Sequence, residues 1–197
     1  MDTREKILVA AATIMRGQGY ARATTKEIAR AAGYSEATLY KHFPDKTEIF
    51  LAVLSEQLPG LSTLLDELEA GRRTVRRNLT VLARTALDFY LHSFPIASSV
   101  FSARELLETH SERVRERGAG PRKPLSALAG YLREEQQLGR VRRGADPEAA
   151  AALLLGACMQ QAMLLLFEGE PVETEKLDAL AASLAGTLLG TLRPANR

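Results

Sequence analysis

The sequence predicts an all-α fold, and three observations support that prediction. Apolar residues recur at three- and four-residue spacing, residues that cap helices precede many of these segments, and no segment shows the two-residue alternation of a strand. The 197 residues are 46% hydrophobic and 25% charged, so the chain can bury a core. We expect about nine helices, divided into an N-terminal three-helix domain at residues 1–46 and a larger helical domain at residues 47–197.

The first helix is predicted directly after Met1. Asp2 and Glu5 form a capping box, in which side chains satisfy backbone amides that the helix start leaves unpaired. An apolar stripe follows at helical spacing and contains Ile7, Leu8, Ala11, Ile14 and Met15. Gly17 and Gly19 are expected to end this helix, which can cover the inner face of the two helices that come next.

Residues 24–43 are predicted to form two short helices joined by a tight turn. Thr24 and Glu27 form a second capping box at the start of the first helix. Gly33 permits the left-handed or tight turn that most residues resist, and Ser35 is a favourable N-cap for the second helix. A helix, a short glycine turn and a helix make the helix-turn-helix pattern, in which the second helix enters the DNA major groove.

The second of these helices is expected to have two distinct faces. Leu39 and Phe43, four residues apart, form its inner face. Its outer face is small and polar, with one cation and one phenol, and consists of Ala37, Thr38, Tyr40 and Lys41. A face of this kind fits a groove and can contact phosphates.

The same segment resembles the DNA-binding domain of the tetracycline-repressor-like (TetR) family of regulators. The residues that match the family pattern are Thr24, Thr25, Ile28, Ala29, Ala32, Gly33, Ser35, Thr38, Leu39, Tyr40, His42, Phe43 and Lys46. The run from Thr38 to Phe43, with Lys46 three residues later, is the most specific part, and the resemblance ends near residue 50. Ala37 departs from the family, which often has glycine there; the departure affects base contact and not the fold.

The resemblance, together with helix geometry, implies a set of DNA-contacting residues. Phosphate contacts fall to Thr25, Tyr40, His42 and Lys46, and base contacts to Lys26, Glu36, Ala37, Thr38 and Lys41, with Ser35 at the helix start. Three of them have another interpretation. Tyr40 could be a core tyrosine, His42 a helix C-terminal residue favoured by the helix dipole, and Glu36 an acidic residue of a first helical turn.

The remainder of the chain is predicted to be helical, but no motif identifies it. We expect helices near residues 45–57, 61–69, 72–90, 95–110, 125–132, 147–167 and 173–192, and a mobile loop or frayed end at residues 111–123. Four arginines open one of these helices: Arg72, Arg73, Arg76 and Arg77. They form either a solvated face or an auxiliary contact for phosphate or an acidic ligand.

The helix near residues 147–167 is apolar enough to raise the question of membrane insertion. Residues 149–167 carry no charge and are long enough to span a bilayer. Gln160 and Gln161 lie in the middle of that stretch, so a buried helix at a subunit interface is the better interpretation. The N-terminus is a capped amphipathic helix without the features of a signal peptide, and we therefore expect a cytoplasmic protein with no membrane partner.

The last two helices are predicted to form a homodimer. They present more apolar surface than one side of a 21.5 kDa monomer can bury, so we expect them to pair with their copies in a two-fold four-helix bundle. Ala182, Gly186 and Gly190 recur at four-residue spacing, which lets two helices approach closely, and Leu184 and Leu188 lie beside this ridge.

The C-terminal helices also supply candidates for a ligand pocket. The large or soft apolar side chains are Phe89, Tyr90, Phe94, Phe101, Tyr131, Met159, Met163 and Phe167, and the polar ones are His92, Arg104, Gln160 and Gln161. As a set they suit an adaptable pocket for a mostly hydrophobic small molecule with an acidic or carbonyl group. Ordinary core packing is the alternative for each apolar residue, and Glu105 could neutralise Arg104.

Enzymatic and metal-binding signatures are absent from the sequence. His42, His92 and His110 show no metal-ligand spacing, and no phosphate-binding glycine loop, nucleophile motif or paired-cysteine motif occurs. Cys158 is the single cysteine, which excludes an internal disulfide framework; it is either a buried inert thiol or a redox sensor. We therefore expect no metal, no cofactor and no enzymatic activity.

The resemblance implies a ligand-responsive transcriptional regulator, in the first place a repressor, that binds a pseudo-palindromic double-stranded DNA operator as a dimer. A small hydrophobic effector that favours wrongly spaced recognition helices would release the DNA through its differential affinity for the two states. Two alternatives stay open: a DNA-binding activator or nucleoid-type binder without a ligand, and a helical small-molecule-binding protein without DNA function. The net charge of +2 permits DNA binding but does not establish it.

Overall fold

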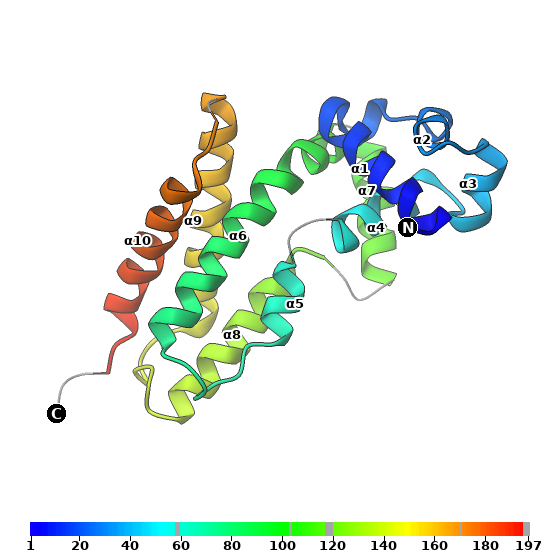
Figure 1. Cartoon of the computed structure of the whole chain (residues 1–197). Helices are drawn as coiled ribbons and strands as arrows, with labels where there is room; N and C mark the ends of the chain where they lie inside the picture. The colour runs from blue at the N-terminus through cyan, green and yellow to red at the C-terminus, as the bar shows by residue number, and fades with distance from the viewer. Residues whose placement is uncertain (58–59, 103, 117–119, 170, 195–197) are drawn as a thin grey trace. The chain divides into compact units, whose positions relative to one another are not determined.

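The computed structural model describes residues 1–57, 60–102, 104–116, 120–169 and 171–194, and this part of the chain is all-α as predicted (Figure 1). It contains ten α-helices and one 3-10 helix, where about nine helices were expected. The helices are α1 (Thr3–Arg22), α2 (Thr25–Ala31), α3 (Glu36–His42), α4 (Lys46–Glu56), α5 (Leu61–Asp66), α6 (Val75–Ala97), the 3-10 helix η1 (Ser98–Ser102), α7 (Arg104–Glu116), α8 (Arg122–Gln137), α9 (Pro147–Glu168) and α10 (Thr174–Leu192).

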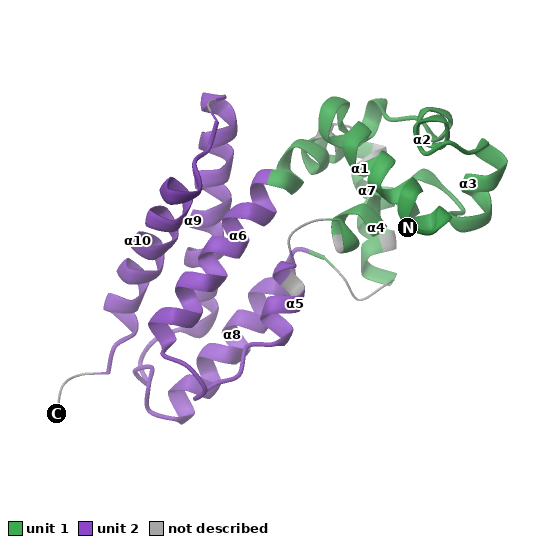
Figure 2. Ribbon diagram, viewed as in Figure 1, with its two compact units in different colours: residues 1–59, 92–120 green, residues 60–91, 121–197 purple. Residues whose placement is uncertain are grey.

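The chain divides into two compact units (Figure 2). Unit 1 comprises Met1–Pro59 and His92–Gly120, and unit 2 comprises Gly60–Leu91 and Pro121–Arg197. Helix α6 begins in unit 2 and ends in unit 1. The units therefore differ from the predicted domains at residues 1–46 and 47–197, because the predicted DNA-binding segment shares its compact unit with α4 and α7.

The core of unit 1 lies under the predicted helix-turn-helix. Helix α1 packs against α2, α3 and α4. Its residues Ile7, Leu8 and Met15 are fully buried, as the apolar stripe predicted, and so are Ile28 of α2 and Leu39 of α3. Helical residues continue to Arg22, but Gly19 has a φ of 79° and breaks the helix at the predicted glycine.

The core of unit 2 is a set of long helices. Helix α9 packs against α8 and α10, and α8 also packs against α5. Helix α6 contributes a buried stripe that contains Leu79, Leu82, Ala83, Ala86 and Leu87. The buried residues of α9 include Ala151, Leu154 and Cys158, which belong to the same cluster.

A buried polar network joins the α5–α6 connection to α8. Glu135 of α8 is fully buried, and its Oε1 accepts a hydrogen bond of 3.3 Å from the amide of Gly71. The guanidinium of Arg140 lies 3.2 Å from the other carboxylate oxygen. One turn earlier, the amide of Asn78 donates to the hydroxyl of Tyr131 at 2.9 Å in the protein interior. These contacts hold segments far apart in the sequence at one end of unit 2.

The structure corrects two predicted boundaries. Pro95 does not start a helix; it lies inside α6, which continues to Ala97. The predicted loop at residues 111–123 is mostly helical, because α7 runs to Glu116 and α8 begins at Arg122, while residues 117–119 lie outside the described part. Helix α7 has an inner face, on which His110 is half-buried and Val114, four residues later, is buried. This face was not recognised from the sequence, because most of the surrounding residues are charged.

Helix α9 passes a length and hydropathy test for a membrane span, and 39% of the tested window is buried inside the chain. Its buried side packs in the core of unit 2, as a soluble core helix does. Cys158 on that side is fully buried and donates a weak hydrogen bond to the carbonyl of Ala83. Burial raises the pKa of this thiol to about 12, so the reactive thiolate is disfavoured and the inert interpretation fits.

Candidate DNA-binding surface

The start of α2 is held by local hydrogen bonds. The hydroxyl of Thr24 accepts from the amide of Glu27 at 3.2 Å, and the Glu27 carboxylate accepts from the amide of Thr24 at 3.1 Å, which confirms the predicted capping box. Hydrogen bonds from the Thr24 side chain and backbone hold the pKa of Glu27 below its usual range. This reciprocal cap places the start of α2, and so Thr25 and Lys26, in one orientation.

The turn between α2 and α3 depends on Gly33. This residue has a φ of 81°, a conformation that residues with a Cβ rarely adopt. The amide of Gly33 donates to the carbonyl of Arg30, and the amide of Tyr34 donates to the carbonyl of Ala29. The two bonds make a Schellman motif, which satisfies the last carbonyls of α2 and redirects the chain into α3.

Helix α3 begins at the predicted cap and has the predicted inner face. The hydroxyl of Ser35 accepts from the amide of Thr38 at 3.1 Å. Leu39 is fully buried and Phe43 is 3% exposed, so both anchor α3 on the core of unit 1. The packing of these two residues therefore determines which residues of α3 face outward.

The outer face carries most of the predicted DNA contacts. Ala37, Lys41 and His42 are exposed, as are Lys26 of α2 and the cap Ser35, while Thr38 is half-buried. Tyr40 is 48% exposed, so it is a surface residue and not part of the core. These residues lie on two short consecutive helices, in the arrangement that a major groove accepts.

A side-chain network links the starts of α2 and α3. The hydroxyl of Thr25 donates to the carboxylate of Glu36 at 2.5 Å and lies 3.3 Å from the hydroxyl of Tyr40. Glu36 is thus engaged by the neighbouring helix, in addition to its place in the first turn of α3. The network stiffens the pair of helices and orients the Tyr40 hydroxyl at the surface.

Lys46 is placed differently from the prediction. Its ammonium is directed into unit 1, where it donates to the carbonyls of Tyr20 and Ala23 at 2.9 Å each and of Ala21 at 3.3 Å. It also lies 4.4 Å from the centre of the Tyr20 ring. Partial burial lowers the pKa of this ammonium. The hydrogen-bond donors of this ammonium are occupied by carbonyls at the end of α1, so Lys46 caps that helix. In this structure its side chain is not free to make the predicted phosphate contact.

Five further residues, which no motif singled out, hold the surface in place. Tyr20 of α1 packs on Phe50 of α4 with ring centroids 4.8 Å apart, and Phe50 packs edge-on against His110 of α7 at 5.0 Å. Burial lowers the pKa of His110, so the neutral ring is favoured in this packing. Arg4 of α1 pairs with both carboxylate oxygens of Glu56 at 2.7 and 2.6 Å. The partners in these contacts are far apart in sequence, so no local pattern could indicate them.

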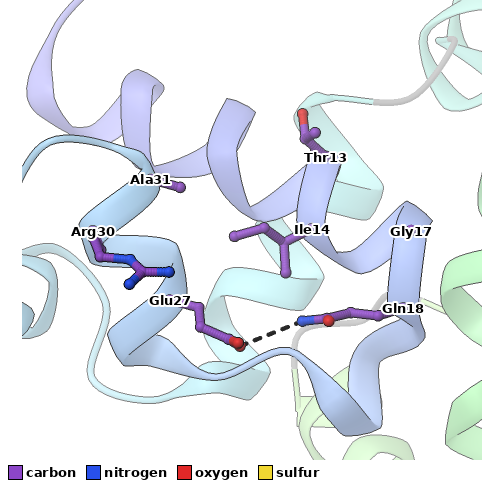
Figure 3. Close-up of a pocket in the computed structure, with 7 residues that line it drawn as sticks. All are labelled: Thr13, Ile14, Gly17, Gln18, Glu27, Arg30 and Ala31. Atoms are coloured by element: carbon purple, nitrogen blue, oxygen red, sulfur yellow. Dashed lines mark hydrogen bonds between the residues drawn. The ribbon is translucent and has the colours of Figure 1, made fainter.

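A shallow hollow of about 530 Å³ lies between α1 and α2 (Figure 3). Its wall is formed by Thr13, Ile14, Gly17, Gln18, Glu27, Arg30 and Ala31. The amide of Gln18 donates to the Glu27 carboxylate at 3.3 Å across it. None of the residues predicted to bind a ligand lines this hollow.

The predicted pocket residues are divided between the two compact units. Phe89 and Tyr90 pack edge-to-face at 5.4 Å in unit 2, where burial raises the pKa of Tyr90 to about 12. Tyr131 is buried, and its hydroxyl is used by Asn78. His92, Phe94, Phe101 and Arg104 belong to unit 1. Phe101 is 73% exposed, and Arg104 pairs with Glu108 at 2.8 Å; the side chain of Glu105 lies outside the described part.

The remaining predicted pocket residues face outward on α9. Met159, Met163 and Phe167 are 48%, 43% and 91% exposed, and Gln160 is exposed beside them, whereas Gln161 is half-buried. Together with Ala149, Ala152, Leu153, Gly156 and Leu164 they form an uncharged exposed face along the helix, here called the α9 face. These side chains lie on the surface of the single chain, and their place in a ligand pocket stays a prediction.

The predicted small-residue ridge of α10 is partly open. Ala182 and Gly190 are exposed, and Leu184 and Gly186 are half-buried. A Cβ on Gly186 would lie 3.4 Å from the guanidinium of Arg76 in the same chain. Leu188 is 8% exposed and packs in the core of unit 2, so little of its side chain is left to form the predicted subunit interface.

Sequence comparison agrees with the site geometry. The model of the family described as bacterial regulatory proteins, tetR family, matches residues 7–53, which cover α2, α3 and most of α1 and α4. The matched segment therefore carries the DNA-binding domain of the TetR family. It is 27% identical over 148 residues to the HTH-type transcriptional regulator YvkB of Bacillus subtilis, covering 75% of each chain. It is 28% identical over 149 residues to the nucleoid occlusion factor SlmA of Marinobacter nauticus, covering 76% of this chain and 74% of SlmA.

Structural comparison extends the likeness over the whole chain. The FadR regulator of Bacillus subtilis, solved with stearoyl-CoA, superposes with a TM-score of 0.71 at 20% identity and covers 96% of this chain and 99% of FadR. At this identity the match shows the fold alone: an N-terminal helix-turn-helix followed by a C-terminal helical domain. The matched family is one of bacterial regulatory proteins, and the relatives include HTH-type transcriptional regulators.

Proposed function

We propose that this TetR-family chain is a cytoplasmic repressor that binds a pseudo-palindromic operator as a homodimer and is released by an apolar effector. The observation that supports it most is the α2–α3 pair, in which local caps and buried Leu39 leave a small, polar, exposed face on α3. That face has the size and chemistry of a major-groove reader.

In this proposal the exposed residues divide into two roles. Lys26, Ala37, Thr38 and Lys41 read base edges, and Tyr40 and His42 contact phosphates. Glu36 and Thr25 bond to each other, so their first role is to fix α2 relative to α3. Lys46 supports the end of α1 that precedes α2.

Dimerisation follows from the surfaces of α9 and α10. The α9 face is apolar along a 22-residue helix, and Ala182 and Gly190 expose a small-residue stripe on α10. Pairing two copies through these faces would remove the exposed apolar side chains from water, each contributing in proportion to its buried area. A two-fold pair presents two α3 helices, which requires two matched half-sites.

Selection of bound sequences from a random duplex library tests the proposed operator binding. We expect a pseudo-palindrome with half-sites about one helical turn, or a multiple of it, apart. Thr38→Ala should change the preferred bases within each half-site, by about 1–3 kcal/mol for a lost base contact. His42→Ala is the matched control, because loss of a phosphate contact weakens binding to all sequences alike. An asymmetric, unrepeated motif would count against a dimeric reader.

The effector is proposed to be a long-chain acyl compound that binds beside Phe89 and Tyr90. The solved FadR relative holds stearoyl-CoA, and it shares the fold of this chain. Phe89 and Tyr90 are half-buried aromatic residues against the core of unit 2. The Tyr90 hydroxyl offers a hydrogen bond to a carbonyl group in apolar surroundings.

Titration of the operator complex with stearoyl-CoA, and with CoA as the control, tests this effector class. We expect stearoyl-CoA to raise the melting temperature of the free protein and to release the DNA, whereas CoA does neither. The reason is linkage: a ligand at a hundred times its Kd stabilises the state it binds by about 2.7 kcal/mol. Tyr90→Phe should weaken the response without changing DNA affinity in the absence of ligand. Release by both compounds alike would refute recognition of the acyl chain.

A nucleoid-type binder without an effector is the second candidate function. The likeness to the SlmA nucleoid occlusion factor over three quarters of the chain favours it. In that case no acyl compound should shift the melting temperature or the DNA affinity, while the selected operator would remain a palindrome.

A further inference from the structure

Three connections of unit 2 meet at one end of the helical bundle. Figure 2 shows the start of α6, the end of α8 and the end of α10 at the same end of unit 2. The amide of Arg142 donates to the carbonyl of Leu192 at 2.8 Å, and its guanidinium donates to the carbonyl of Thr191 at 2.5 Å. The guanidinium of Arg140 donates to the carbonyl of Arg73. Residues 71–77, 138–146 and 191–194 are therefore neighbours in space.

These connections carry almost only positive charge. Their arginines are Arg72, Arg73, Arg76, Arg77, Arg140, Arg142, Arg143 and Arg193, and their one acid is Asp146. The Asp146 carboxylate is occupied, because it accepts from the amides of Glu148 and Ala149 at the start of α9. Exposed acids gather instead at the opposite end of α9 and α10, at Glu168, Glu173, Glu175 and Asp178.

Six of these arginines have no carboxylate partner within the described residues. Arg72 pairs with Glu69 at 3.0 Å, and Arg140 with the buried Glu135. The exposed residues that form no ion pair in the described part are Arg73, Arg76, Arg77, Arg142, Arg143 and Arg193, here called the arginine surface.

Stability of the fold does not account for this arrangement. Arg76 and Arg77 lie in the first turn of α6, which contains no acidic residue. Cations at a helix N-terminus oppose the helix dipole, and neighbouring like charges repel each other. The fold therefore holds these charges together against their mutual repulsion, and an anionic partner would relieve it.

We propose that the arginine surface is a second, sequence-independent contact for the phosphates of nucleic acid, separate from α3. The arginines are spread over three exposed segments and do not converge on an enclosed cavity, which fits an extended polyanion better than a small anion. A lipid surface fits less well, because Leu138 is the one large exposed apolar side chain that these connections contribute among the described residues. The surface goes beyond operator recognition, since it would hold DNA of any sequence.

The test uses the full-length chain with α3 disabled by Ala37→Glu and Lys41→Glu. Its affinity for a duplex without the operator is measured between 50 and 200 mM salt. We expect residual, strongly salt-dependent binding. Adding Arg73→Gln, Arg76→Gln and Arg77→Gln should lower that affinity at least tenfold and reduce the salt slope by about 0.9 for each lost phosphate contact.

A matched triple variant separates the surface from net charge. Arg122→Gln, Lys123→Gln and Lys176→Gln remove the same charge from the starts of α8 and α10, and we expect unchanged binding. Equal losses in both triples, or no duplex binding by the α3-disabled chain, would overturn the proposal. So would a result in which the arginine triple abolishes binding to phosphatidylserine vesicles but leaves duplex binding intact. Far-UV circular dichroism and melting temperature confirm that each variant is folded.

Discussion

The double variant Gly156→Glu and Met163→Glu is expected to be a folded monomer whose operator affinity is at least about 100-fold lower, because engaging two linked half-sites raises affinity by about 10²–10⁴. Both positions lie on the α9 face. Nothing lies within 4 Å of a Cβ placed on Gly156, and Met163 is 43% exposed, so glutamate fits either position in one chain. Between two copies the same carboxylates would be buried without partners.

Sedimentation at micromolar concentration and operator titration check the two halves of this result. Leu138→Glu is the control, because it places a glutamate on an exposed leucine outside the α9 face and should leave the dimer intact. A double variant that still sediments as a dimer would show that the interface lies elsewhere. A wild-type chain that sediments as a monomer would contradict dimerisation altogether.

Glu135→Ala is expected to destabilise the protein by about 3 kcal/mol, near the lower end of what removing one partner of a buried ion pair costs. The variant leaves the amide of Gly71 without its partner and removes the carboxylate that faces Arg140. The Arg140 side chain is 29% exposed and can still reach water, which is why the loss should not be larger. At this chain length each kcal/mol lowers the melting temperature by roughly 2–4 °C.

Urea unfolding of Glu135→Ala, compared with Glu135→Gln and the parent, measures this effect. The amide of glutamine still accepts from Gly71, so Glu135→Gln should lose less than Glu135→Ala. If both variants fall within about 0.5 kcal/mol of the parent, the effect is that of an ordinary surface substitution and the network does not hold the α5–α6 connection.

The candidate DNA-binding surface was predictable to the extent that its contacts are local. The Thr24–Glu27 cap joins residues three apart, and the Gly33 turn closes over five residues. Leu39 and Phe43 share a face because a helix places residues four apart on one side. Such interactions depend on residues close together in the chain and on regular helix geometry, so they can be predicted from the sequence. The same holds for the resemblance to the TetR family, whose matching residues all lie in this segment.

The roles of other residues were decided by contacts between distant segments. Lys46 was predicted on the DNA side, but it bonds to carbonyls of residues 20–23, more than twenty positions earlier in the chain. Tyr20, Phe50 and His110 stack although they come from three separate helices. The spacing of residues along the sequence cannot indicate a contact between such distant residues, because the contact depends on how whole helices pack against each other.

Sequence by itself determined the all-α fold, the capped helix-turn-helix and the resemblance of that segment to the TetR family, because capping, turn and helical periodicity are short-range effects. Only the tertiary structure decided which apolar residues are core and which are surface. Helix α9 is apolar on nearly every side, so periodicity could not distinguish buried Leu154 from exposed Leu153 or Met163. That distinction depends on which side α8 and α10 cover, and for a uniformly apolar helix it is settled by packing alone.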